Sequence, residues 1–129
     1  MPDVITVGAI DIVAPYKNPA GARLSRPWFQ SNYGPCVDIW SPGTYIESAS
    51  SGRDVTAVMS GTFQATSIAT GVAATILEEQ PDLSPAGVKS ALLEAASPSL
   101  LLTNRPRTTS MVLQVPLTDP IPMAMQAPI

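Results

Sequence analysis

One uncharged stretch decides the fold: residues 59–74, which read MSGTFQATSIATGVAA. Apolar side chains recur in and after this stretch at spacings of three and four residues, which predicts a helix over about 63–79. This apolar stripe consists of Ala65, Ile68, Ala69, Val72, Ala73, Ile76 and Leu77. The other side chains are mostly Thr, Ser, Gly and Ala. We therefore expect the helix to be buried almost all round.

A second helix is predicted over about 84–96, because Ser84 is a typical N-cap and Pro85 suits the first helical position. Lys89 is expected on its outer face. Short β-branched or alternating runs predict strands, and the Pro- and Gly-containing segment 11–31 between the first two predicts a loop. The predicted strands are 4–10, 36–40, 45–48 and 55–58.

The last part of the chain differs in composition. Residues 99–129 contain five prolines and no glycine, and their apolar residues follow no clear period. We interpret 1–97 as one domain segment and 98–129 as an irregular Pro-rich tail, with a short strand at 111–115.

Charge and composition exclude several partners. The net charge is −3 and charged residues make up 13% of the chain, with no Lys/Arg cluster for nucleic acid. The uncharged stretch between Asp54 and Glu78 is long enough to cross a bilayer. It is rich in Thr and Ser and divides into a strand, a turn and a helix, so we predict no membrane contact. The N-terminus has no basic leader before an apolar run, which predicts no signal peptide.

Two residue types limit the chemistry. Histidine is absent, so a Ser-His-Asp or Cys-His mechanism cannot be carried by this chain alone. Cys36 is the only cysteine, which excludes an internal disulfide framework and a cysteine-based zinc site. A free cysteine behaves as a small hydrophobe, and we expect a buried thiol.

The stretch at 59–74 resembles the active-site segment of the subtilases, the subtilisin-like (peptidase S8) serine proteases, which reads S-G-T-S-M-A-[ST]-P-H-V-A-G-V-A-A. When the two are aligned on Gly61, Thr62 and Ala65, the attacking serine of the family falls on Phe63. A benzyl group has no lone pair with which to attack a carbonyl, so no catalytic residue is predicted. Ser67-Ile68 replaces the Pro-His pair of the family pattern.

Three further blocks carry the same resemblance, in the order of the family. They are residues 2–9, similar to P-x-V-I-T-V-G-A; residues 26–43, similar to R-x-x-F-S-N-Y-G-x-x-V-D-I-x-A-P-G; and residues 83–92, similar to the helix that usually closes the domain. The resemblance is nearest to the proteinase K-like branch. It implies an α/β, partial subtilisin-like fold with mainly parallel strands, equivalent to roughly the last third of a catalytic domain.

The resemblance also implies a metal site. Some proteinase K-like subtilases bind calcium through two main-chain carbonyls and one carboxylate, and these positions match Pro2, Val4 and Asp38. Such oxygen ligands suit a hard cation. The alternative is that Asp38 is a strand-end aspartate bonded to nearby backbone. Calcium is thus the one cofactor expected, if any is bound.

Three functions remain open from the sequence. The chain is expected to be a degenerate, truncated subtilase domain, inactive because Phe63 replaces the nucleophile and no histidine is present. Alternatively, it is a pseudoprotease module that captures an extended peptide or a partner chain. A third reading is a fragment of a longer active protease, which would be secreted. The expected partners are a peptide or the N-terminal half of the protease domain.

Overall fold

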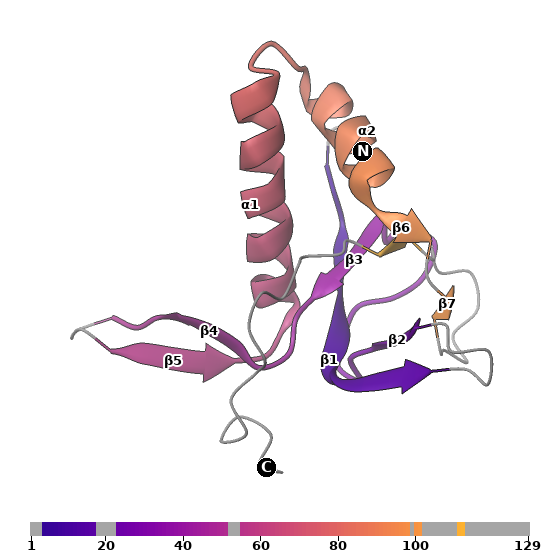
Figure 1. Ribbon diagram of the computed structural model, residues 1–129, viewed down its shortest axis with the longest axis vertical. Coiled ribbons are helices and arrows are strands. Elements are labelled where there is room, and N and C mark those ends of the chain that lie inside the picture. Colours follow the sequence, from indigo (N-terminus) through magenta and orange to yellow (C-terminus); the bar gives the residue numbers. More distant parts are fainter. Residues whose placement is uncertain (1–3, 18–22, 52–54, 99, 102–110, 113–129) are drawn as a thin grey trace.

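The computed structural model describes residues 4–17, 23–51, 55–98, 100–101 and 111–112. These residues form a mixed α/β structure with two helices and two small sheets (Figure 1). Its elements are β1 (Val7–Lys17), β2 (Arg23–Pro27), β3 (Ile39–Pro42), β4 (Ile46–Ala49), β5 (Thr56–Met59), α1 (Thr62–Glu79), α2 (Pro85–Ala95), β6 (Ser97–Pro98), β7 (Leu100–Leu101) and β8 (Met111–Val112). The predicted α/β class is confirmed.

The larger sheet has the strand order β6-β8-β3-β1-β2-β7, and β4 pairs with β5 in a separate ribbon. Among the described strands, β1–β3, β2–β7 and β3–β8 are parallel, whereas β1–β2, β4–β5 and β6–β8 are antiparallel. The expectation of mainly parallel strands is therefore only partly met. The pairs β1–β2 and β4–β5 join consecutive strands, and consecutive strands with a short connection pair as antiparallel hairpins.

The loop predicted over 11–31 is wrong, because β1 continues to Lys17 and pairs with β2. The pairing register shifts between Asp11 and Tyr16, and Pro15 lies inside this interval. Proline cannot donate a ladder hydrogen bond, so an irregularity in the pairing accommodates it within the strand. The other predicted strands are present, each shifted by one to three residues.

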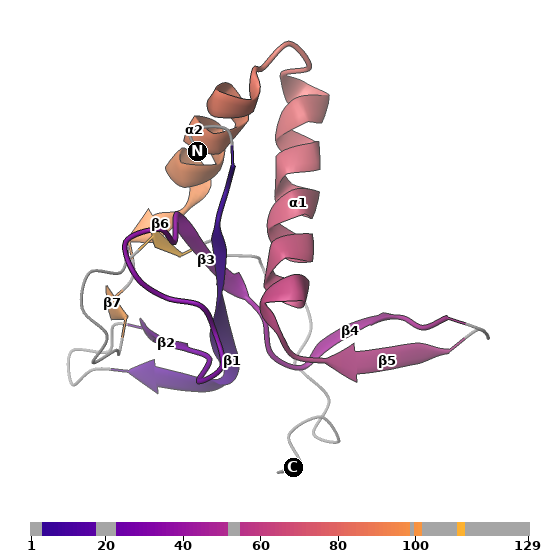
Figure 2. The ribbon, with the colours of Figure 1, turned by 180° about the vertical axis from the view of Figure 1, so that it is seen from behind.

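The core lies where α1 and α2 pack on β1 and β3 (Figure 2). Ala9, Ile39, Ala65 and Leu92 are each at most 1% exposed and belong to this cluster. A second buried cluster holds Ile10, Val37, Trp40 and Val112. Val112 is in β8, so the predicted tail is not irregular throughout. Of the strand predicted over 111–115, β8 covers 111–112, and 113–115 lie outside the described residues.

Both predicted helices are confirmed within one residue. The hydroxyl of Ser84 accepts a hydrogen bond from the Gly87 amide at 3.2 Å, which confirms the predicted N-cap of α2. The prediction that α1 is buried almost all round is wrong, since only Ala65 and Ala69 are fully buried in it. Neither of these helices, nor any other in the described ranges, is long and apolar enough to cross a membrane.

Candidate functional site

The site begins at the N-terminus of α1, beside the end of β3. Gly61 precedes the helix, with no side-chain cap, and its amide donates to the Gly43 carbonyl at 2.7 Å. The Gly61 carbonyl accepts from the Ala65 amide at 3.2 Å. The bond between Gly61 and Gly43 ties the start of the helix to the end of β3, and the bond between Ala65 and Gly61 belongs to the first helical turn. Phe63 consequently occupies a defined place in the first helical turn.

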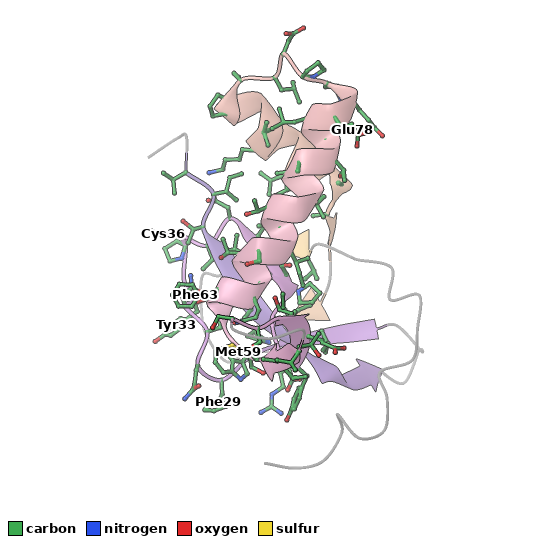
Figure 3. The ribbon with its side chains drawn as sticks, turned by 90° about the vertical axis from the view of Figure 1, so that its left-hand side faces the viewer. Phe29, Tyr33, Cys36, Met59, Phe63 and Glu78 are labelled. Carbon is green, nitrogen blue, oxygen red and sulfur yellow. The ribbon has the colours of Figure 1, made fainter. Side chains whose placement is uncertain are left out.

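Phe63 is the most exposed large hydrophobic residue described, with 84% of its surface accessible. It projects at the lower end of α1 on the same side of the molecule as Phe29, Tyr33 and Cys36, while Glu78 marks the other end of the helix (Figure 3). Backbone N–H groups at a helix N-terminus favour negative charge. The backbone surroundings thus suit a developing oxyanion, whereas the side chain provides no nucleophile.

Hydroxyl groups near Phe63 are already engaged in hydrogen bonds. Ser67 donates to the carbonyl of Phe63 at 2.9 Å, and Thr66 donates to the carbonyl of Thr62 at 2.7 Å. Ser60 lies before the helix and accepts from the Tyr45 amide at 2.9 Å. The chain contains no histidine that could activate any of these hydroxyl groups. A substitute serine nucleophile therefore has no geometric support here.

A hollow of about 500 Å³ lies beside Phe63. Its described lining comes entirely from α1 and consists of Thr62, Phe63, Thr66, Ser67 and Thr70. One helix can form only one wall of a binding cleft. The hollow is thus an open depression along the helix, with one described wall.

The same side of α1 forms an uncharged exposed surface, which we call the outer face of α1. It comprises Phe63, Thr66, Ser67, Thr70, Gly71, Ala74 and Leu77. Its hydroxyls bond back to carbonyls one turn earlier in the helix; Thr70, for example, donates to Thr66 at 2.8 Å. Self-satisfied hydroxyls and the absence of charge are features of a buried helix face rather than of a solvated one.

A second cluster lies where the approach to β1 meets α2. Lys89 Nζ is 2.8 Å from Asp38 Oδ1 and donates to the Val4 carbonyl at 3.1 Å. Asp38 Oδ2 accepts from the Thr6 amide at 2.9 Å. The Asp38 amide in turn donates to the Thr6 carbonyl at 2.9 Å. Asp38 thus holds both backbone groups of Thr6.

The pKa of the Asp38 carboxyl reflects these contacts. Partial burial alone would raise it, but the hydrogen bond from Lys89, the hydrogen bond from the Thr6 amide and the positive charge of Lys89 together hold the pKa of Asp38 below its ordinary value. The carboxylate is therefore ionised at neutral pH and paired with the Lys89 ammonium.

The structure brings two of the three predicted calcium ligands together and leaves calcium itself a prediction. Val4 and Asp38 both contact Lys89, and Pro2 lies outside the described residues. The described ranges hold no group of three or more acidic, histidine or cysteine side chains that could bind a metal. The donors that are described fit calcium poorly, because an ammonium group already contacts both of them.

Two sequence interpretations near the site are corrected. Lys89 was expected on the solvent side of its helix, but its side chain is only 21% exposed and is bonded to Asp38. Sequence reasoning missed it because its partners lie far away along the chain. Cys36 was expected to be buried and is instead an exposed free thiol. It lies in the turn that precedes β3, where a side chain can reach solvent.

Comparison with known proteins gives one consistent family. The model of the subtilase family matches residues 1–115. An extracellular serine proteinase of Thermus sp. (strain Rt41A) is 38% identical over 87 residues, which are 67% of this chain and 21% of the relative. Subtilisin-like protease 2 of Arthroderma otae is 35% identical over 101 residues, 78% of this chain and 22% of the relative.

Solved structures agree. A cold-adapted subtilisin-like serine proteinase superposes with a TM-score of 0.69 at 31% identity, covering 87% of this chain and 36% of that one. Sphericase has a TM-score of 0.68 at 22% identity, covering 89% of this chain and 41% of its own, and supports the fold alone. The chain spans about a fifth of the length of the curated relatives it matches.

Proposed function

The chain belongs to the subtilase family, and from this we propose that it forms a non-catalytic segment of a subtilisin-like serine protease domain. One observation carries the proposal: Phe63 stands at the N-terminus of α1, at the position that the family resemblance gives to the attacking serine. Covalent catalysis at this point needs an oxygen or sulfur nucleophile. Phenylalanine provides neither.

The surroundings of Phe63 support the same proposal. The hydroxyl of Ser67 is committed to a hydrogen bond within the helix. The chain contains no histidine to take a proton from any other hydroxyl. A general base would have to come from another part of a longer polypeptide, and it would then face a phenyl ring.

The test is covalent labelling of the full-length natural polypeptide with a fluorophosphonate probe, which reacts with activated serines. The wild-type protein is expected to remain unlabelled. The variant F63S restores a hydroxyl at the position, and T66S is its matched control, because it adds a serine one turn further along the same helix. Labelling of the wild type at a serine of residues 4–98 would contradict the proposal.

The outer face of α1 favours a partner for this segment: another part of a protease domain that packs against the helix. Seven neighbouring positions there carry no charge, and the hollow beside Phe63 has one described wall. Burial of such a face releases water from apolar groups without leaving a charge unpaired. A second part of the domain would also cover the hollow beside Phe63.

Peptide capture is the second candidate function. The β4–β5 ribbon belongs to neither edge of the larger sheet and pairs only with itself among the described strands. An extended peptide can add to such an edge through main-chain hydrogen bonds. A column of immobilised random peptides distinguishes the two candidates. Retention of the full-length polypeptide on the column supports peptide capture. Retention that F63S does not alter places the bound peptide away from the helix.

The relative from Thermus is named as extracellular. We extend this location to the polypeptide that contains this segment, as a proposal for the longer protein. Detection of the protein in the culture medium, compared with an intracellular marker, is the corresponding test.

A further inference from the structure

Lys89 extends from α2 to the first residues of the described chain. Its ammonium group contacts Asp38 Oδ1 at 2.8 Å and the Val4 carbonyl at 3.1 Å. The second carboxylate oxygen of Asp38 binds the Thr6 amide. One cation thus connects three segments: the approach to β1, the approach to β3 and helix α2.

The position of Lys89 on α2 is fixed by packing. Val88 and Leu92, one residue before and three residues after it, are 9% and 1% exposed and anchor the helix in the core. The Lys89 side chain is 21% exposed and that of Asp38 25%. Both charged groups are mostly shielded from water, so their attraction is screened less than in an exposed pair.

Lys89 contacts oxygens of two of the three residues that the subtilase resemblance implies for calcium, Val4 and Asp38. A calcium ion needs about 6–8 oxygen ligands at close range. Of the calcium ligands that the resemblance implies, the described chain contains the Val4 carbonyl and the Asp38 carboxylate. The positively charged Lys89 nitrogen contacts both of them. A divalent cation at this place would have to displace the ammonium or accept its repulsion.

We propose that the Lys89 ammonium is the built-in cation of this junction and replaces calcium there. The junction is then held by a covalently attached charge whose effective concentration does not depend on the medium. The stability of this part of the domain becomes independent of calcium. The inference concerns stability and does not rest on the non-catalytic role of Phe63.

The first test is thermal unfolding of the full-length natural polypeptide in excess EDTA and in millimolar calcium, with terbium luminescence as a direct probe of metal binding. The unfolding midpoint of this region, followed by hydrogen exchange of peptides that contain Thr6, is expected to be the same in both media. A calcium-dependent rise in the protection of these peptides would overturn the proposal, because a ligand bound to the native state stabilises it.

The second test removes the cation. K89M keeps the length of the side chain and is expected to lower the protection of the Thr6 peptides in EDTA, and calcium is expected to restore part of the loss. K89R retains the charge and should remain insensitive to calcium. K17M, at the chain's other lysine, is the matched control and should leave the Thr6 peptides unchanged.

Each result of the second test decides the proposal. Protection in K89M equal to the wild type, or an equal loss in K17M, would overturn it. So would a K89M protein that loses protection without responding to calcium, since Lys89 would then be an ordinary ion pair. If K89M does not fold in EDTA, K89R in the two media still distinguishes a fixed cation from a metal site.

Discussion

The amide of Gly61 donates a 2.7 Å hydrogen bond to the carbonyl of Gly43, and this bond joins the end of β3 to the start of α1. A Cβ atom on Gly43 would lie 2.5 Å from Ala9 Cβ and 2.9 Å from the Gly61 carbonyl oxygen. Glycine therefore permits the close approach of β1, β3 and α1. The place of Phe63 follows from this contact, since the helix begins one residue after Gly61.

Gly43→Ala is expected to destabilise the fold, because the added methyl group meets both a backbone oxygen and a core side chain. Overpacking of this kind typically costs about 1–3 kcal/mol in the free energy of unfolding. Denaturant unfolding of the full-length polypeptide measures it. Ser90→Ala is the matched control: Ser90 is exposed on α2, so the substitution should change the free energy of unfolding by no more than about 0.5 kcal/mol. Equal effects of the two variants would contradict the packing argument.

Ser41 and Ser31 are both buried, but their substitution by alanine is expected to change the stability of the protein differently. The Ser41 hydroxyl has no hydrogen-bond partner in the described part of the chain, whereas Ser31 Oγ accepts from the Ala9 amide at 2.9 Å. Ser41→Ala should be neutral or stabilising. Ser31→Ala should cost about 1–3 kcal/mol, because the buried Ala9 amide loses its acceptor. A larger loss in Ser41→Ala than in Ser31→Ala would contradict this difference.

The stability of the Asp38 junction should depend on pH. The pKa of Asp38 is lower in the folded protein than in the unfolded chain. The contribution of Asp38 to the free energy of unfolding is therefore fully present above the unfolded pKa of about 4. This contribution is lost as the pH falls through the lower folded pKa. Asp38→Asn removes the titrating group, and its unfolding free energy should depend less on pH below about 4. Identical pH profiles for the two proteins would refute the assignment.

A charge on the outer face of α1 should interfere with packing against the rest of the domain. Thr70→Glu places a carboxylate in the middle of that face, and a buried unpaired charge is among the most destabilising single changes. Ser90→Glu, on the exposed side of α2, is the matched control. We expect faster limited proteolysis of the full-length polypeptide only for Thr70→Glu. Equal proteolysis rates would mean that the face remains in solvent.

Local signals predicted the helices well. Ser84 and Pro85 are a capping pair that acts within one turn, so the start of α2 could be placed from sequence. The spacing of the apolar residues predicted α1 equally well, because this spacing is also a local signal. The exposure of α1 was not predictable, because the absence of charge in residues 63–77 normally means burial. That pattern still describes a face suited to burial, which is why we propose a covering partner.

Long-range features escaped sequence reasoning. The ion pair of Lys89 and Asp38 and the bond from Lys89 to Val4 connect residues far apart in the chain, the latter separated by 85 positions. A lysine on a helix surface gives no local sign of such a partner. The extension of β1 was missed because Pro15 resembles a loop signal. The alignment of Phe63 with the attacking serine of the subtilases, in contrast, rests on the pattern of residues 59–74 alone and stays a prediction.

The most direct test of the central claim is the steady-state hydrolysis of a broad set of fluorogenic peptides by the purified full-length natural polypeptide. The account predicts no turnover above the buffer blank for the wild type, because Phe63 stands at the position that the family resemblance gives to the nucleophile. Turnover that a serine-protease inhibitor abolishes, with the covalent adduct mapped to a serine among residues 55–98, would contradict it.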